Sequence, residues 1–202
     1  MPTLYDIKPR FQALLRPLVR HLAAAGVTAN QVTLAAAGLS LAVGALLAWR
    51  PHSRAILLLV PVTLFVRMAL NAIDGMLARE HGQKSPLGAV LNELCDVIAD
   101  AALYLPFALI PALHSGLVVG VVVLAIVSEM TGVVAVQIGA SRRYDGPLGK
   151  SDRAFLFGLL ALLAGLNVSM TRWGDLLLLI ATGLLVLTIV NRVRQALAEL
   201  KR

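Results

Sequence analysis

Six apolar stretches, each close to the length of a membrane span, dominate this sequence of 202 residues. A helix needs about 20 apolar residues to cross the hydrocarbon core of a bilayer. Only 14% of the residues are charged, against about 25% in ordinary soluble domains. The sequence therefore predicts an all-α, multi-pass membrane protein, and it excludes a soluble enzyme, a disordered tail and a coiled coil. We expect one domain, residues 1–202, with six transmembrane helices at about 31–49, 54–80, 87–112, 117–140, 154–168 and 176–193.

Residues 1–22 precede the first span and lack the uninterrupted apolar core of a signal peptide. Their apolar residues recur at steps of three and four from Leu4 to Leu22, with basic residues between them. This pattern predicts an amphipathic helix that lies in the membrane interface. The alternative is a helix packed on a soluble core, which a chain consisting almost entirely of spans does not offer.

The distribution of Lys and Arg predicts the orientation of the chain. With both termini in the cytoplasm, 14 of the 18 basic residues lie on the cytoplasmic side, and only Arg50, Arg54 and Arg172 lie opposite. Cytoplasmic loops of membrane proteins carry such an excess. We interpret the net charge of +7 as this asymmetry plus affinity for anionic membrane lipids, and not as nucleic-acid binding. The expected location is a bacterial-type inner or plasma membrane.

Two neighbouring spans carry polar side chains on one face each. These residues are spaced about one helical turn apart: Arg67, Asn71 and Asp74 in the second span, and Asn92, Asp96 and Asp100 in the third. Charged groups inside a span are costly and usually mark a site. Because a short turn joins the two spans, antiparallel packing can bring both faces to one cavity, with Arg79 and Lys84 at its mouth.

Clustered carboxylates of this kind favour a hard divalent cation such as Mg²⁺, Mn²⁺ or Ca²⁺. The single cysteine, Cys95, and the four scattered histidines do not suggest zinc. A metal ion beside Arg and Lys is suited to holding a phosphate or diphosphate. The alternatives are a buried network that only joins helices and a small transporter. A transporter is less favoured because the two halves of the chain do not match and the charges gather at one end of a helix pair.

The stretch from Asn71 to Asp96 resembles the signature of the CDP-alcohol phosphatidyltransferases, D-x2-D-G-x2-A-R-x8-G-x3-D-x3-D. The spacing matches throughout, and six fixed residues match in type: Asp74, Gly75, Ala78, Arg79, Gly88 and Asp96. The interfacial helix, the Thr28-Ala29-Asn30 start of the first span and the six spans also resemble the family in outline. The segment 146–153 is similar to a polar loop that several members place beside the acceptor pocket.

This resemblance implies transfer of a phosphatidyl-type group from a CDP-linked lipid, with CDP-diacylglycerol as the expected donor, to an acceptor alcohol with release of CMP. It implies that Asp96 is the general base and that Mg²⁺ or Mn²⁺ is the cofactor. It further implies contacts to the CDP-lipid from Gly75, Ala78, Arg79 and Gly88, contacts to acceptor or phosphate from Lys150 and Arg153, and a homodimer.

Two signature aspartates are replaced here, by Asn71 and Asn92. Asparagine offers a metal ion a carbonyl oxygen but no charge, whereas Asp100, one turn beyond Asp96, could restore one charge. The expected metal ligands are Asp74, Asp96, Asp100, Asn71 and Asn92. An active enzyme, a changed metal or donor preference, and an inactive CDP-lipid-binding relative all remain open, and we favour the enzyme. Glu129 is either an acceptor-pocket group or a carboxylate paired with a neighbouring helix.

Overall fold

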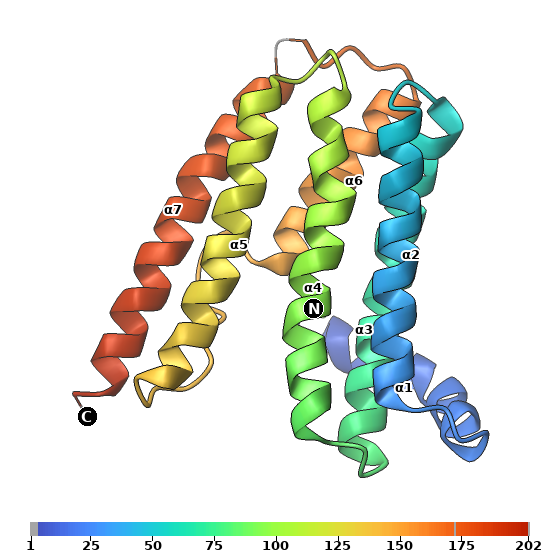
Figure 1. Cartoon of the computed structure of the whole chain (residues 1–202), viewed down its shortest axis with the longest axis vertical. Coiled ribbons are helices and arrows are strands. Elements are labelled where there is room, and N and C mark those ends of the chain that lie inside the picture. Colours follow the sequence, from blue (N-terminus) through green and yellow to red (C-terminus); the bar gives the residue numbers. More distant parts are fainter. Residues whose placement is uncertain (1–3, 172, 202) are drawn as a thin grey trace. The chain divides into compact units, whose positions relative to one another are not determined.

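The computed structural model describes residues 4–171 and 173–201, and this range is all-α. Residues 1–3, Arg172 and Arg202, which the sequence predictions include, lie outside the described residues. The described helices are α1 (Leu4–Ala24), α2 (Ala29–Trp49), α3 (Arg54–Glu80), α4 (Pro86–Tyr104), a 3₁₀ helix η1 (Leu105–Leu109), α5 (Ser115–Gln137), α6 (Lys150–Gly165) and α7 (Gly174–Glu199) (Figure 1).

Four of the described helices are long and apolar enough to cross a membrane: α2, α3, α5 and α7. The protein is therefore a multi-pass helical membrane protein. Helix α4 carries Glu93, Asp96 and Asp100 within its 19 residues, and α6 has only 16 residues. Length and composition alone thus do not place α4 and α6 across the bilayer.

The helix that carries the first half of the signature, α3, has the predicted bounds. Helix α2 begins two residues earlier than predicted, after Thr28. Its first turn is closed by a reciprocal pair of hydrogen bonds. The N–H of Gln31 donates to Thr28 Oγ1 at 3.2 Å, and the N–H of Thr28 donates to Gln31 Oε1 at 2.9 Å. This capping box fixes where α2 starts.

The prediction of one continuous helix over 87–112 is wrong at its C-terminal end. The α-helix ends at Tyr104 and continues as η1. Pro106 explains the change, because proline has no N–H to donate to the preceding turn. The next helix, α5, also ends three residues before the predicted 140, where Gly139 adopts a φ of 89°.

The loop predicted over 141–153 is shorter than expected, because α6 begins at Lys150. The N–H of Gly149 donates to Asp152 Oδ2 at 2.8 Å, which closes the first turn of the helix. Arg153 therefore lies in the first turn of α6 and not in a loop. Helix α7 extends to Glu199, six residues beyond the predicted end of the last span at 193.

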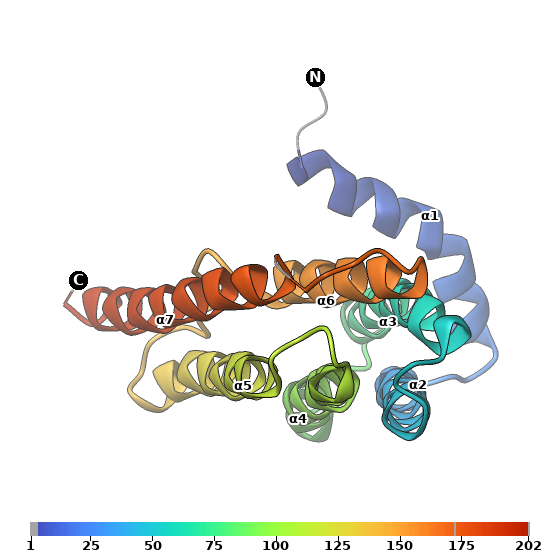
Figure 2. The ribbon, with the colours of Figure 1, turned by 90° about the horizontal axis from the view of Figure 1, so that it is seen from above.

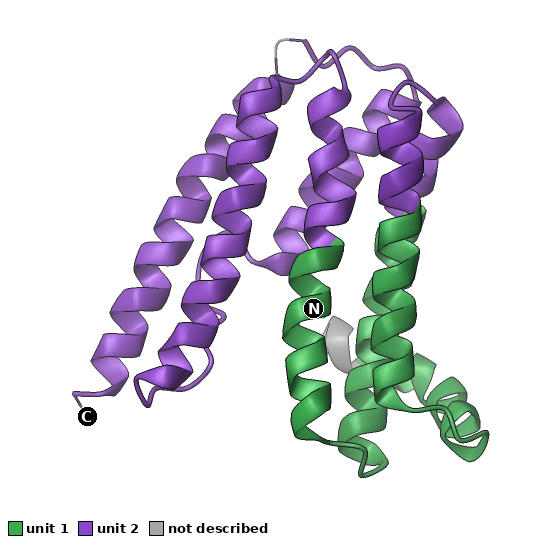
Figure 3. Ribbon diagram, in the orientation of Figure 1, with its two compact units in different colours: residues 1–42, 62–99 green, residues 43–61, 100–202 purple. Residues whose placement is uncertain are grey.

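The chain divides into two compact units, which Figure 3 colours separately. Unit 1 contains residues 1–42 and 62–99, and unit 2 contains residues 43–61 and 100–202. The core of unit 1 lies where α1, α2 and α3 meet, and it is formed by Val19, Ala29, Val32, Ile73, Met76 and Leu77. Helix α1 contributes Val19, which is fully buried, to this core, whereas Leu14 and Leu18 of α1 stay exposed.

In unit 2, α5 and α7 lie side by side (Figures 1 and 2). The ring of Tyr104 stacks on Phe157 of α6 with centroids 4.1 Å apart, and Phe107 of η1 meets Phe157 edge-on. Gly44 of α2 lies directly against the backbone carbonyl of Ala102 in α4, so closely that any Cβ at position 44 would collide with it. These contacts join α5, α6, α7 and the end of α4 that lies in unit 2 to their neighbours within that unit.

Candidate functional site

In unit 1 the polar faces of α3 and α4 meet, as predicted. The side chain of Arg67 donates from Nη2 to the backbone carbonyl of Asp96 at 3.1 Å and lies 3.7 Å from Asp96 Oδ1. Asn71 donates from Nδ2 to the same Oδ1 at 3.2 Å. Arg67 is buried, and the side chain of Asp96 keeps 27% of its surface exposed. Asp96 is therefore held from two sides and is still accessible.

The other signature carboxylate, Asp74, is buried and bonded to α2. Thr33 Oγ1 donates to Asp74 Oδ2 at 2.8 Å. The same hydroxyl oxygen lies 3.1 Å from the carbonyl of Ala29. A hydroxyl has a single hydrogen to donate, and a bond to an ionised acceptor is the stronger choice. Thr33 thus fixes the orientation of Asp74, and no sequence signal pointed to this residue.

Two glycines of the signature lie directly against polar side chains of unit 1. A Cβ at Gly75 would lie 3.0 Å from Nη1 of Arg79, so the guanidinium group folds over this glycine. A Cβ at Gly88 would lie 2.8 Å from Asn30 Oδ1. Ala78 is half-buried against the core of unit 1. A side chain at position 75 or 88 would therefore displace Arg79 or Asn30.

The turn between α3 and α4 is fastened to its neighbours in unit 1. Gln83 accepts a hydrogen bond from the N–H of Ala29 at 2.6 Å and donates to the carbonyl of Val27 at 3.2 Å. Arg16 of α1 donates two hydrogen bonds of 3.1 Å to the carboxylate of Glu80, and these bonds raise the pKa of Arg16. Both ties restrain the end of α3 that carries Arg79.

Unit 2 contains a second group of charges, in which Asp100 takes part. Arg153 donates from Nη2 to Asp100 Oδ2 at 3.3 Å and to Glu129 Oε1 at 2.9 Å. The Glu129 carboxylate also accepts a hydrogen bond from Arg142 at 2.9 Å and lies 3.4 Å from Arg192. Glu129 therefore pairs with neighbouring elements, which was one of its two predicted roles. The sequence did not indicate Arg142 and Arg192 as its partners, since they lie 13 and 63 residues away.

The structure thus brings Asn71 and Asp96 together, and it pairs Asp74 with Thr33 and Asp100 with Arg153. Asn92 is exposed on α4, one turn before Asp96, and Lys150 begins α6. Over residues 4–171 and 173–201, no group of three or more His, Cys, Asp or Glu side chains is arranged to hold a metal ion.

A sequence model of the CDP-alcohol phosphatidyltransferases matches residues 26–197. The chain belongs to this family. It is 49% identical over 195 residues to the inner membrane protein YnbA of Escherichia coli, covering 96% of each chain. It is also 38% identical over 101 residues to a phosphatidylinositol phosphate synthase of Corynebacterium glutamicum, covering 50% of this chain and 44% of the relative.

Solved structures share the fold. The phosphatidylinositol phosphate synthase PgsA1 of Mycobacterium tuberculosis with CDP-DAG bound matches with a TM-score of 0.74 and 22% identity, over 89% of this chain and 92% of PgsA1. The PgsA1 structure with manganese and citrate matches with a TM-score of 0.69 and 23% identity, over 89% and 87% of the two chains. The multi-pass helical fold predicted from the sequence is therefore shared with PgsA1.

Proposed function

We propose that this protein transfers a phosphatidyl-type group from a CDP-linked lipid, CDP-diacylglycerol, to an acceptor alcohol and releases CMP in phospholipid biosynthesis. The observation that carries the proposal is the meeting of the two signature helices at Asp96, which contacts Arg67 and Asn71. Membership of the family supports the reaction class. The CDP-DAG bound to PgsA1 supports the donor class.

The oxygen-rich residues of the signature fit a hard divalent cation, Mg²⁺ or Mn²⁺. Asp74 and Asp96 offer carboxylates, and we infer that Asn71, Asn92 and Asp100 contribute further oxygens. Such an ion, when bound, would offset the negative charge of the diphosphate. The manganese in one PgsA1 structure supports this cofactor class.

In the proposed reaction the Asp96 carboxylate takes the proton from the acceptor hydroxyl. The acceptor oxygen forms a bond to the lipid-side phosphorus, the bond from that phosphorus to the CMP oxygen breaks, and CMP leaves with the electron pair. General-base assistance of this kind contributes typically about 10²–10⁴-fold to the rate. Arg67 holds the Asp96 carboxylate in place, and Arg79 binds the phosphate of the departing nucleotide.

The remaining signature residues bind the donor, and the start of α6 binds the acceptor. Gly75, Ala78 and Gly88 would let the nucleotide approach the backbone, because glycine and alanine add little or no side chain there. Lys150 and Arg153 would contact the acceptor.

We further propose that α4 and α6 cross the membrane together with α2, α3, α5 and α7, giving six spans with both termini in the cytoplasm. The Lys and Arg asymmetry supports this orientation. The 49% identical relative is an inner membrane protein, which supports a bacterial inner-membrane location. The match of the family model over residues 26–197 supports a single domain, and the resemblance to the family suggests a homodimer.

The test is release of CMP from CDP-diacylglycerol by the purified protein in lipid nanodiscs, with Mg²⁺, Mn²⁺ or a chelator and an acceptor pool from native membranes. Asp96→Asn should lower turnover at least 100-fold and leave donor binding intact. Asp175→Asn is a matched control, because an amide oxygen can still accept the 2.7 Å bond from the N–H of His114. If Asp96→Asn turns over normally and Asp100→Asn is inactive, the two roles are exchanged.

A binding-only relative is the second candidate, and Asn71 is the observation that favours it. Its amide donates a hydrogen bond to Asp96. A carboxylate at position 71 could not donate this bond and would repel Asp96 unless a cation lay between them. Asn71→Asp with Asn92→Asp should therefore increase the thermal stabilisation by Mn²⁺. Asn167→Asp, the same change in a turn with φ of 62°, is the control. Unchanged metal dependence in the double variant would contradict this arrangement. A wild-type protein that releases no CMP would leave binding as the function.

A further inference from the structure

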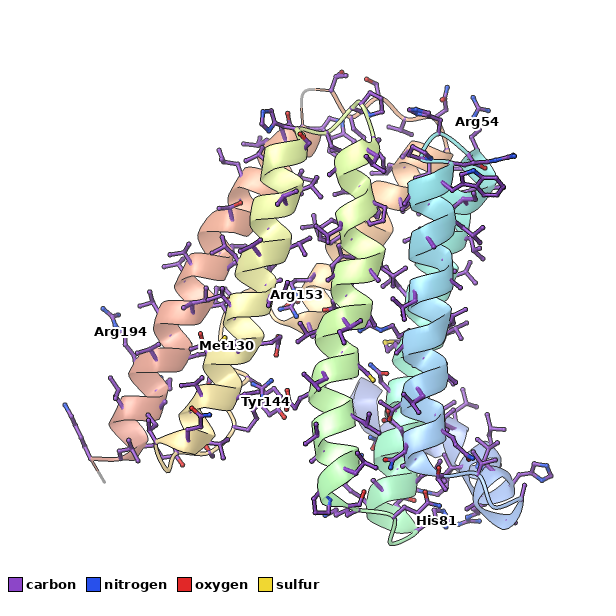
Figure 4. The ribbon with its side chains drawn as sticks, viewed as in Figure 1. Arg54, His81, Met130, Tyr144, Arg153 and Arg194 are labelled. Atoms are coloured by element: carbon purple, nitrogen blue, oxygen red, sulfur yellow. The ribbon has the colours of Figure 1, made fainter. Side chains whose placement is uncertain are left out.

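The carboxylate of Glu129 lies among three arginines in unit 2. Arg142, in the loop between α5 and α6, donates to its Oε2 at 2.9 Å. Arg153 of α6 donates to its Oε1 at 2.9 Å, and Nη1 of Arg192 in α7 lies 3.4 Å from Oε2. Figure 4 labels Arg153 at the start of α6. Sequence positions far apart thus converge on one acidic side chain.

This group is buried and largely neutralised. Arg153 and Arg192 are each 1% exposed, and the side chain of Glu129 is 14% exposed. Arg153 also pairs with Asp100. Among these five side chains, three guanidinium groups and two carboxylates leave a net charge of one positive unit. A buried site with so little net charge attracts a multiply charged anion weakly, because the carboxylates repel it and removing its water is costly.

Arg142 and Arg192 have further bonds. Arg192 donates to the backbone carbonyls of Ser128 and Asp145, and Arg142 donates to the carbonyl of Arg143 at 2.6 Å. Arg153 differs from them. Its Nε and Nη1 are buried and have no hydrogen-bond partner among the residues that the structure describes. Buried N–H groups of a guanidinium without acceptors are rare, so their presence points to a ligand that supplies oxygen atoms.

We propose that Glu129 determines acceptor specificity, by excluding phosphate from the arginine cluster and selecting an uncharged alcohol with several hydroxyl groups. This inference rests on the proposed transferase function. Hydroxyl oxygens of such an acceptor can accept from Nε and Nη1 of Arg153, and a hydroxyl hydrogen can donate to Glu129. A phosphorylated acceptor would compete with Glu129 for the same guanidinium groups and meet its negative charge.

The activity test compares matched acceptor pairs: glycerol with glycerol 3-phosphate, and myo-inositol with inositol 1-phosphate. CMP release from CDP-diacylglycerol by the wild-type protein should show at least a 10-fold higher kcat/KM for the uncharged member of the preferred pair. Glu129→Gln should lower this ratio at least 10-fold. Glu199→Gln is the matched control, because Glu199 also pairs with an arginine, Arg143, at 2.8 Å but is 40% exposed, and its ratio should stay at the wild-type value.

A second measurement does not need turnover. Inorganic phosphate should raise the melting temperature of Glu129→Gln by several degrees more than that of the wild type or of Glu199→Gln. The double variant Glu129→Gln with Arg192→Gln restores the net charge and should lose this response. A wild-type protein that prefers phosphorylated acceptors would overturn the inference. So would a Glu129→Gln protein that phosphate stabilises no more than it stabilises the wild type.

The two proposals fail in different ways. If no acceptor supports CMP release, the transferase function fails, and the phosphate response of Glu129→Gln still decides whether Glu129 excludes anions. If CMP is released but only with phosphorylated acceptors, the transferase function stands and the inference about Glu129 is wrong.

Discussion

If Asp74 holds the proposed divalent cation, removing the Thr33 hydroxyl should weaken binding of that cation and of the proposed CDP-lipid donor. Thr33 Oγ1 donates to Asp74 Oδ2 at 2.8 Å, and the two residues are 7% and 5% exposed. A hydrogen bond to a charged group contributes about 1.5–3 kcal/mol. Since a tenfold change in binding corresponds to about 1.4 kcal/mol, Thr33→Val should raise the apparent metal constant about 10- to 100-fold. This range agrees with the usual effect of mutating groups that orient metal ligands.

The assay is a Mn²⁺ titration of CMP release, paired with a Mn²⁺ titration of the melting temperature. Thr33→Ser keeps the hydroxyl and should stay close to the wild type. Thr182→Val is a matched control, because the Thr182 hydroxyl bonds only to the carbonyl of Leu178 in its own helix, at 2.9 Å. A Thr33→Val protein that folds normally and binds Mn²⁺ within about twofold of the wild type would refute the argument that Thr33 orients Asp74.

The close contact between α2 and α4 predicts that Gly44→Ala destabilises the protein by about 1–3 kcal/mol, because its Cβ would meet the carbonyl of Ala102. Gly38→Ala on the same helix meets nothing within 4 Å and should be neutral or slightly stabilising; equal melting temperatures of the two variants would contradict the packing described. For topology, Arg50→Cys on a Cys95→Ala background should react with a membrane-impermeant thiol reagent only from the side opposite the cytoplasm. Labelling from the cytoplasm would contradict the six-span orientation.

Much of the fold could be predicted because the apolar periodicity is strong and the breaks between spans are polar. The bounds of α3 are those predicted, and α2 begins within two residues of the predicted start. The errors lie where local chemistry competes with hydrophobicity. Pro106 converts the end of the third predicted helix to a 3₁₀ helix, and Asp152 starts α6 inside a segment whose charges indicated a loop.

The site was predictable as far as helical spacing reaches. Residues one turn apart on two helices joined by a short turn share an interface, so the meeting of Asn71 with Asp96 followed from the sequence. Contacts between distant segments did not. Thr33 lies 41 residues before Asp74, and neither its type nor its spacing distinguishes it from other helical threonines. The partners of Glu129 could not be predicted from helical spacing either, because each comes from a different element.

The mutual neutralisation of Glu129 and its arginines has a consequence for biogenesis. A charged side chain at the centre of an isolated transmembrane helix opposes insertion by about 2.5–3.5 kcal/mol. Of the segments that pair in this cluster, α5 with Glu129 is synthesised first. The segments that carry Arg142, Arg153 and Arg192 follow in chain order. Each later segment therefore brings a positive charge to a carboxylate that is already present. Arg192 of α7 is synthesised last, after the Glu129 carboxylate with which it pairs. Helix α5 made without the segments that follow it should insert less efficiently than the same helix with Gln at position 129.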